Sequence, residues 1–195
     1  FITPSEFLKK KLSLNGFEEK RIHCIPTFTA SKTTIGKQQI GSYGLYFGRV
    51  TEEKGVETVI KAYEKLPEYT VKIMGDDTTD EAKRLKKYVE NHKMKNVEFL
   101  GFKSGAELEN VIKGARFTLI PSIWYDNLPN TALESFQYSK PVIASNIGSL
   151  PELVIDGENG YLFKPSNVED LIKKIKMLDL SLIHISEPTR PISIS

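Results

Sequence analysis

Gly44-Leu45-Tyr46-Phe47 is a short apolar run, and a helical pattern over residues 59–66 follows it. Short apolar runs and helical segments then continue to alternate as far as residue 163. The runs that we expect to be strands are 44–47, 71–74, 97–100, 117–120, 141–144 and 160–163. This alternation predicts an α/β fold with a parallel sheet covered by helices on both faces. Ligands bind such sheets beyond the carboxyl ends of the strands, so we expect functional residues directly after these runs.

Capping boxes, in which Ser or Thr is followed three residues later by Glu, predict where several helices begin. They are Thr3 with Glu6, Ser104 with Glu107, and Ser166 with Glu169. Pro4 at the first helical position and Gly16 as a stop signal support a helix between them. Further helices are expected over residues 59–66, 80–92 and 129–138.

Three regions of the chain differ in pattern. Residues 1–42 hold the first helix, an apolar run over 21–25 and a polar, aperiodic stretch, and we interpret them as the end of one domain and a linker. Residues 43–178 carry the strand–helix alternation and form one domain. Residues 179–195 are predicted to be a disordered tail, because no helical or strand period continues after Ser181. The segment 181–190 resembles the translation of a sequencing adapter, so we expect the tail to be non-native.

Composition excludes several classes of function. A net charge of +2 in 195 residues argues against a nucleic-acid partner. The lysines at 9–11 and 83–87 are interpreted as solvated helix faces, with contact to acidic lipid or a phosphorylated ligand as the alternative. The single cysteine, Cys24, predicts a buried structural thiol and fits a cytoplasmic compartment; contact of the full-length protein with the inner membrane face stays open. His23 and His92 stand alone, and G-x-G-x-x-G is absent from the sequence, so no metal or cofactor is expected.

Two basic residues follow the first expected strand. Arg49 and Lys54 lie five residues apart in a loop that leaves the carboxyl end of that strand. A planar guanidinium and a mobile ammonium can converge on neighbouring phosphates. The alternative is that both are ordinary surface cations.

A second candidate lies where Pro129 can start a helix. The amides of Asn130 and Thr131 fall near that helix N-terminus, which favours an anion. Asp126 precedes the helix and Glu134 lies about one turn inside it, so both carboxylates can face one crevice and accept hydrogen bonds from sugar hydroxyls. The alternatives are a capping role for Asp126 and solvent exposure for Glu134. Trp124 and Tyr125 line the sugar pocket or serve packing.

These motifs occur in an order that resembles the C-terminal, donor-binding domain of family 4 glycosyltransferases of the GT-B architecture. The matching pieces are Gly48-Arg49, Lys54-Gly55, Gly75-Asp76, 99–102, Pro121-Ser122, Asp126 with Glu134, 141–145, 148–152 and 156–160. The resemblance covers roughly residues 1–177. It implies a Rossmann-like sheet preceded by a short fragment of the N-terminal, acceptor-binding half.

The resemblance also implies residue roles. Arg49 and Lys54 correspond to the residues that bind the donor diphosphate, and Glu134 to the one that holds the ribose. Asp126 stands where the family has a glutamate that contacts the transferring sugar, so its reach is one methylene shorter. Pro129 removes one phosphate-binding amide, which leaves Asn130 and Thr131 as candidates.

We therefore expect a retaining hexosyltransferase domain that uses UDP- or GDP-hexose without an essential metal, in bacterial surface glycan synthesis. The resemblance places the acceptor domain before residue 1, so we expect the fragment itself to be inactive. Two alternatives stay open: a non-catalytic nucleotide- or glycan-binding module, and a GT-B sugar-nucleotide epimerase.

Overall fold

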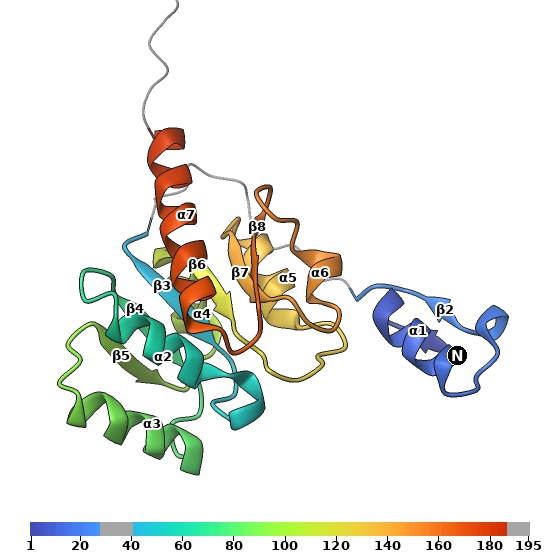
Figure 1. Cartoon of the computed structure of the whole chain (residues 1–195), viewed down its shortest axis with the longest axis horizontal. Coiled ribbons are helices and arrows are strands. Elements are labelled where there is room, and N and C mark those ends of the chain that lie inside the picture. The colour runs from blue at the N-terminus through green and yellow to red at the C-terminus, as the bar shows by residue number, and fades with distance from the viewer. Residues whose placement is uncertain (28–40, 187–195) are drawn as a thin grey trace, which may run out of the picture.

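The computed structural model describes residues 1–27 and 41–186, with side chains described as far as residue 180. Its main feature is a six-stranded sheet in the order β5-β4-β3-β6-β7-β8, in which every neighbouring pair is parallel (Figure 1). The strands are β3 (Tyr43–Phe47), β4 (Val71–Met74), β5 (Val97–Gly101), β6 (Ala115–Ile120), β7 (Val142–Ser145) and β8 (Gly160–Phe163). All six predicted strands are confirmed. The strand order reverses at the β3–β6 pair, which makes that carboxyl edge the expected place for a ligand.

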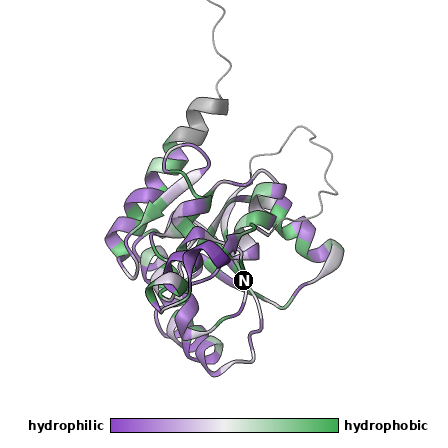
Figure 2. Cartoon of the chain, turned by 90° about the vertical axis from the view of Figure 1, so that its right-hand side faces the viewer, coloured by the Kyte–Doolittle hydropathy of each residue, from purple (hydrophilic) through white to green (hydrophobic). Residues whose placement is uncertain are grey.

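Helices cover both faces of the sheet, as predicted. Side chains alternate along each strand, so neighbouring residues of one strand pack against helices on opposite faces. Tyr46 packs in the large core cluster with α2 (Val56–Glu64), α3 (Asp80–Asn91) and α7 (Val168–Ser186). Its neighbours Leu45 and Phe47 pack on the other side with α4 (Gly105–Gly114). The helices α5 (Asn130–Gln137) and α6 (Leu150–Leu153) cover the β6–β7 part of the sheet. Figure 2 shows hydrophobic and hydrophilic residues alternating around the helices, as expected for helices packed on one side only.

The capping boxes correctly indicate helices but misplace two of the caps. The first helix is α1 (Glu6–Leu14), and Ser5, not Thr3, caps it by accepting a hydrogen bond from the Leu8 amide at 3.2 Å. Thr3 is unavailable because it belongs to strand β1 (Ile2–Thr3). Ser166 cannot cap α7 because its φ is +59°; instead the Asn167 side chain accepts from the Asp170 amide at 2.9 Å.

The predicted boundary at residue 178 is too early. Helix α7 continues to Ser186, so the expectation of a disordered tail is wrong for residues 179–186. That stretch contains neither Gly nor Pro, and the first helix-breaking residue after it is Pro188. Residues 187–195 of the predicted tail, and residues 28–40 of the predicted linker, lie outside the described residues.

The N-terminal residues form a small unit beside the sheet domain (Figure 1). Strand β1 pairs in parallel with β2 (His23–Cys24), and α1 and a short 3₁₀ helix (Glu19–Arg21) connect them. The Glu152 carboxylate of α6 accepts hydrogen bonds from the Glu6 and Phe7 amides at 2.9 and 2.6 Å. This contact compensates the positive end of α1 and attaches the unit to the sheet domain. Cys24 is half-buried rather than buried as expected.

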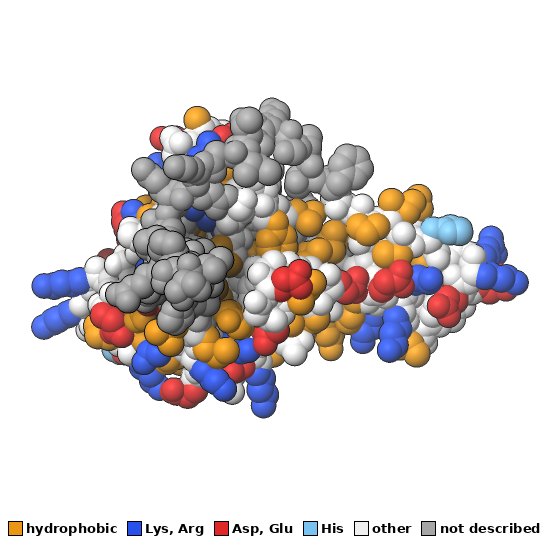
Figure 3. Space-filling model, turned by 90° about the horizontal axis from the view of Figure 1, so that it is seen from above, with side chains coloured by type: hydrophobic (Ala, Val, Ile, Leu, Met, Phe, Trp, Pro, Cys, Tyr) orange, Lys and Arg blue, Asp and Glu red, His pale blue; other side chains and the backbone are white. Residues whose placement is uncertain are grey.

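Charged side chains are mixed on the surface. Seen from above, lysine and arginine side chains are spread among acidic ones rather than gathered in one patch (Figure 3). Within the second lysine cluster, Lys86 pairs with Asp77 at 2.5 Å and Lys83 with Asp80 at 3.7 Å. These pairs agree with the interpretation of a solvated helix face. Within residues 1–27 and 41–186, no helix has the length and apolar content needed to cross a membrane.

Candidate functional site

The loops after β3 and β4 touch through their backbones. The Gly48 amide donates to the Met74 carbonyl at 3.0 Å. A Cβ on Gly75 would lie 2.0 Å from the Gly48 carbonyl oxygen, so only glycine fits there. The two glycines of the sequence motifs therefore let the loops close against each other at the carboxyl edge of the sheet.

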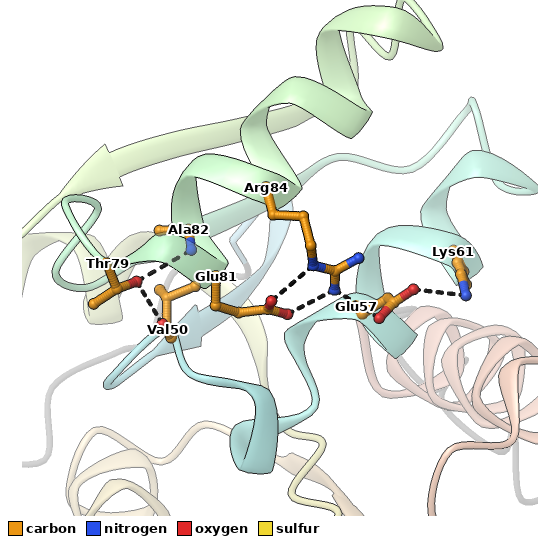
Figure 4. Close-up of polar contacts among 7 residues, drawn as sticks. All are labelled: Val50, Glu57, Lys61, Thr79, Glu81, Ala82 and Arg84. Carbon is orange, nitrogen blue, oxygen red and sulfur yellow. Dashed lines mark hydrogen bonds and ion pairs between the residues drawn. The ribbon is translucent and has the colours of Figure 1, made fainter.

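Polar contacts join the β3 loop to the neighbouring helices (Figure 4). The Thr79 hydroxyl donates to the Val50 carbonyl at 2.7 Å and accepts from the Ala82 amide at 3.1 Å, which caps α3. Arg84 of α3 donates to Glu81 at 2.8 Å and to Glu57 of α2 at 2.7 Å. The loop that carries Arg49 is thus attached to the start of α3, and α3 is in turn attached to α2.

A cavity of about 320 Å³ opens at this edge and contains half of the predicted site residues. Its lining is Phe47, Gly48, Arg49, Met74, Gly75, Asp76, Phe102, Lys103, Leu108, Thr131 and Glu134. Of the predicted residues, Arg49, Thr131 and Glu134 are brought together here. Asn130, Lys54 and Asp126 do not line the cavity.

Glu134 is a half-buried carboxylate with a free hydrogen-bonding capacity. Partial burial raises the pKa of its carboxyl group above the ordinary value. Among the described residues, its carboxylate group has no hydrogen-bond or ion-pair partner. An uncompensated carboxylate costs stability unless something pairs with it, so this position is suited to a ligand that donates hydrogen bonds.

The anion-binding groups lie on the same cavity. The Arg49 side chain is 74% exposed, and its only ion pair among the described residues is a long 4.0 Å contact with Glu53. Helix α5 begins at Asn130, and the Ala132 amide makes the first helical hydrogen bond, to Pro129 at 3.0 Å. The preceding amides of Asn130 and Thr131 therefore have no acceptor within the helix. A guanidinium and a helix N-terminus facing one cavity can bind a phosphate.

Lys54 and Asp126 form a separate group. The Lys54 ammonium contacts Asp126 Oδ1 at 2.6 Å, and the Ser122 hydroxyl donates to Asp126 Oδ2 at 2.7 Å. Both oxygens of this carboxylate are therefore engaged within the protein. Trp124 and Tyr125 do not line the cavity; the Tyr125 ring packs 5.2 Å from the Phe7 ring of α1.

The sequence analysis gave no functional role to Phe102 and Lys103, which also line the cavity. Phe102 and Lys103 follow β5 directly, at a strand end where ligands were expected, and the Phe102 side chain is a largely exposed aromatic. Their position directly after a strand could have indicated a place in the site, but their residue types indicated no specific chemistry. Among the described residues, no group of three or more His, Cys, Asp or Glu side chains could hold a metal ion.

Comparison with known proteins shows the family to which the chain belongs. A family described as "Glycosyl transferases group 1" matches residues 31–180, and the chain belongs to this family. An uncharacterized glycosyltransferase of Methanocaldococcus jannaschii is 34% identical over 134 residues, which are 69% of this chain and 37% of that protein.

Solved glycosyltransferase structures share the fold, a GT-B-type parallel sheet flanked by helices. The lipopolysaccharide outer core galactosyltransferase WaaB superposes with a TM-score of 0.77 at 22% identity, over 93% of this chain and 53% of that one. Anabaena HepE in complex with UDP superposes with a TM-score of 0.81 at 21% identity, over 95% of this chain and 54% of that one. Another HepE structure holds UDP-glucose. The chain thus spans about half the length of these structures and about a third of the curated relative.

Proposed function

We propose that the cavity binds the nucleoside diphosphate of a hexose donor, UDP-hexose or GDP-hexose, for a retaining family 4 transferase. The observation that carries this proposal is Glu134, a half-buried carboxylate without a protein partner among the described residues, on the same cavity as Arg49 and the α5 N-terminus. A carboxylate that can accept hydrogen bonds from hydroxyl groups lies here beside anion-binding groups. This combination matches a ligand with a sugar at one end and phosphates at the other. The UDP complex of HepE supports UDP as the first nucleotide to test.

Each group receives one role in this proposal. Arg49 and the α5 amides contact the diphosphate, where negative charge develops as the donor bond breaks. Glu134 accepts hydrogen bonds from the ribose hydroxyls. Phe102 lies on the cavity with an exposed aromatic face, on which a base can stack.

A role in bacterial surface glycan synthesis is also part of the proposal, and it is supported by the name of the structurally similar lipopolysaccharide outer core galactosyltransferase. Because the chain spans 53–54% of the solved transferases, we also propose that it binds a donor but does not transfer the sugar alone. Orientation of the acceptor and exclusion of water would need the remaining half.

Titration calorimetry with UDP, GDP and uridine tests the proposal. We expect UDP or GDP to bind, with Arg49→Ala weakening the diphosphate but not uridine, and Glu134→Gln weakening both. No binding of either nucleotide at millimolar concentration, or binding that neither variant changes, would contradict it.

A non-catalytic nucleotide-binding module is the second candidate. The engaged carboxylate of Asp126 favours it, because a fully paired acid is not free to act on a sugar. Joining this chain to an N-terminal half and measuring sugar transfer would separate the two functions.

A further inference from the structure

Tyr46 is a buried tyrosine of β3 whose hydroxyl group reaches the loop that carries Arg49. Its side chain is 4% exposed and packs in the large core cluster, and it does not line the cavity. The hydroxyl donates a hydrogen bond to the Arg49 carbonyl at 2.5 Å. Because Arg49 does line the cavity, this bond joins the core of the sheet domain to a residue of the candidate site.

The backbone on either side of Arg49 is fixed as well. The next carbonyl, that of Val50, accepts from the Thr79 hydroxyl at 2.7 Å (Figure 4). The residue before, Gly48, has φ +147°, which other residues rarely adopt, and its amide donates to the Met74 carbonyl at 3.0 Å. The three residues 48–50 are therefore each held by a hydrogen bond to another part of the sheet domain.

The Arg49 side chain contrasts with its main chain. It is 74% exposed, and its contact with Glu53 is long, at 4.0 Å. An arginine side chain has many rotamers, and a ligand that binds the guanidinium has to restrict them. A main chain that is already fixed leaves less conformational freedom to lose on binding, which favours the ligand.

The Tyr46 hydroxyl is suited to a permanent donor role. Burial raises the pKa of this hydroxyl, and the nearby Asp126 and Glu53 carboxylates raise it further. An ionised phenolate could not donate a hydrogen bond. The hydroxyl therefore stays protonated, and the bond to the Arg49 carbonyl persists even in mildly alkaline solution.

We propose that Tyr46 is a positioning residue for Arg49, whose loop it fixes before the diphosphate binds; this rests on the proposed function. Tyr46 does not touch the ligand and acts on it through Arg49. Its hydroxyl should therefore matter for a ligand that carries phosphates and not for the bare nucleoside.

A double-mutant cycle tests this role. UDP and uridine are titrated calorimetrically into the wild-type chain, Tyr46→Phe, Arg49→Ala and the double variant. Phenylalanine keeps the ring in the core and removes only the hydroxyl. Tyr46→Phe should weaken UDP roughly three- to tenfold, within the coupling range of contacting residues, and leave uridine unchanged. In the Arg49→Ala background the same substitution should change the UDP affinity by less than about twofold.

Tyr43→Phe is the matched control, because Tyr43 is at the amino end of the same strand and its hydroxyl donates to the Val111 carbonyl at 2.8 Å. Both variants lose one hydrogen bond to a carbonyl, so their melting temperatures should fall by similar amounts. Only Tyr46→Phe should weaken UDP. Hydrogen exchange gives a second readout without ligand: the Gly48 amide should exchange faster in Tyr46→Phe than in the wild type or in Tyr43→Phe.

Three results would overturn the positioning role alone. Equal losses for UDP and uridine would show that the hydroxyl shapes the whole cavity. A loss of UDP affinity that persists without Arg49 would show that Tyr46 acts independently of that side chain. Unchanged UDP affinity in Tyr46→Phe, while Arg49→Ala weakens UDP, would show that the loop keeps its conformation without this bond. If the wild-type chain binds no UDP, the proposed function fails and the positioning role fails with it, a result that is seen before any substitution is made.

Discussion

Asp126 and Glu134 are carboxylates on either side of the start of α5, yet their surroundings differ. Asp126 has a partner on each oxygen and lies outside the cavity lining. Glu134 lines the cavity and is half-buried, and its carboxylate has no hydrogen-bond or ion-pair partner among the described residues. The comparison shows that two acids in one motif can serve different purposes. One is satisfied by the protein and stabilises it, whereas the other retains hydrogen-bonding capacity for a ligand.

The largest effect is expected on the cavity side, from Arg49→Ala. Loss of a charge-assisted hydrogen bond of about 1.5–3 kcal/mol should weaken UDP roughly 10- to 150-fold. Uridine affinity and the melting temperature should stay unchanged, since the side chain is mostly exposed. Calorimetry of Arg49→Ala, with Lys83→Ala as an exposed control outside the cavity, checks this. Equal losses for UDP and uridine would show that Arg49 shapes the loop rather than binding phosphate.

On the ion-pair side we expect a loss of stability from Asp126→Asn. The change leaves the Lys54 ammonium, 20% exposed, without its counter-charge. Partial exposure limits the cost to about 1–2 kcal/mol, or roughly 2–8 °C in melting temperature. The matched control is Glu18→Gln, because Glu18 belongs to an exposed pair with Lys20 and should cost almost nothing. Equal melting temperatures for both variants would mean that the Lys54–Asp126 pair is not stabilising.

Phe102→Ala should weaken UDP by a smaller factor. The side chain is 74% exposed, so we expect the lower end of base stacking, about 1 kcal/mol or roughly fivefold. Trp124→Ala is the matched control, because Trp124 is similarly exposed at 67% but does not line the cavity. An equal effect of the two substitutions would argue against a base site at Phe102.

The smallest effect is expected from removing residues 181–195. The last buried side chain along α7 is Leu178 within the part of the helix whose side chains are described, and the Arg116–Asp179 pair at 2.6 Å is retained. The melting temperature should change by less than about 2 °C, the effect of roughly 0.5 kcal/mol in a domain of this size. A loss of several degrees in differential scanning calorimetry would show that the tail contributes to the core.

The strands could be predicted from the sequence because short apolar runs with helical segments between them have few other solutions. The proximity of Arg49, Thr131 and Glu134 could also be predicted, since Arg49 follows the end of β3 and the other two lie in the first turns of the helix that follows β6. The Lys54–Asp126 pair could not, because the two residues are 72 apart and their contact depends on Gly55 fitting against Pro121. The spacing of motifs in the sequence predicts which residues share an edge of the sheet. It does not predict which of these residues pair with each other in the folded protein.

The cap at Ser5 shows the same limit on a local scale. Thr3 and Glu6 have the spacing of a capping box, but pairing of β1 with β2 keeps Thr3 in a strand. The cap therefore lies at Ser5 rather than at Thr3, because of a strand pairing that the local sequence pattern does not show.

The central claim, that Glu134 is kept for a ligand at a cost to stability, is tested most directly by the melting temperature of Glu134→Gln against pH. Burial raises the pKa of Glu134 in the folded state, so ionisation costs stability as the pH rises through that pKa, and no cost remains well below the unfolded value. We predict that Glu134→Gln has a higher melting temperature than the wild type at pH 7. The two melting temperatures should be equal at about pH 3, which is below the unfolded pKa. The variant should also bind uridine more weakly. A variant that melts lower than the wild type at pH 7 would show that Glu134 is satisfied within the protein and contradict the account.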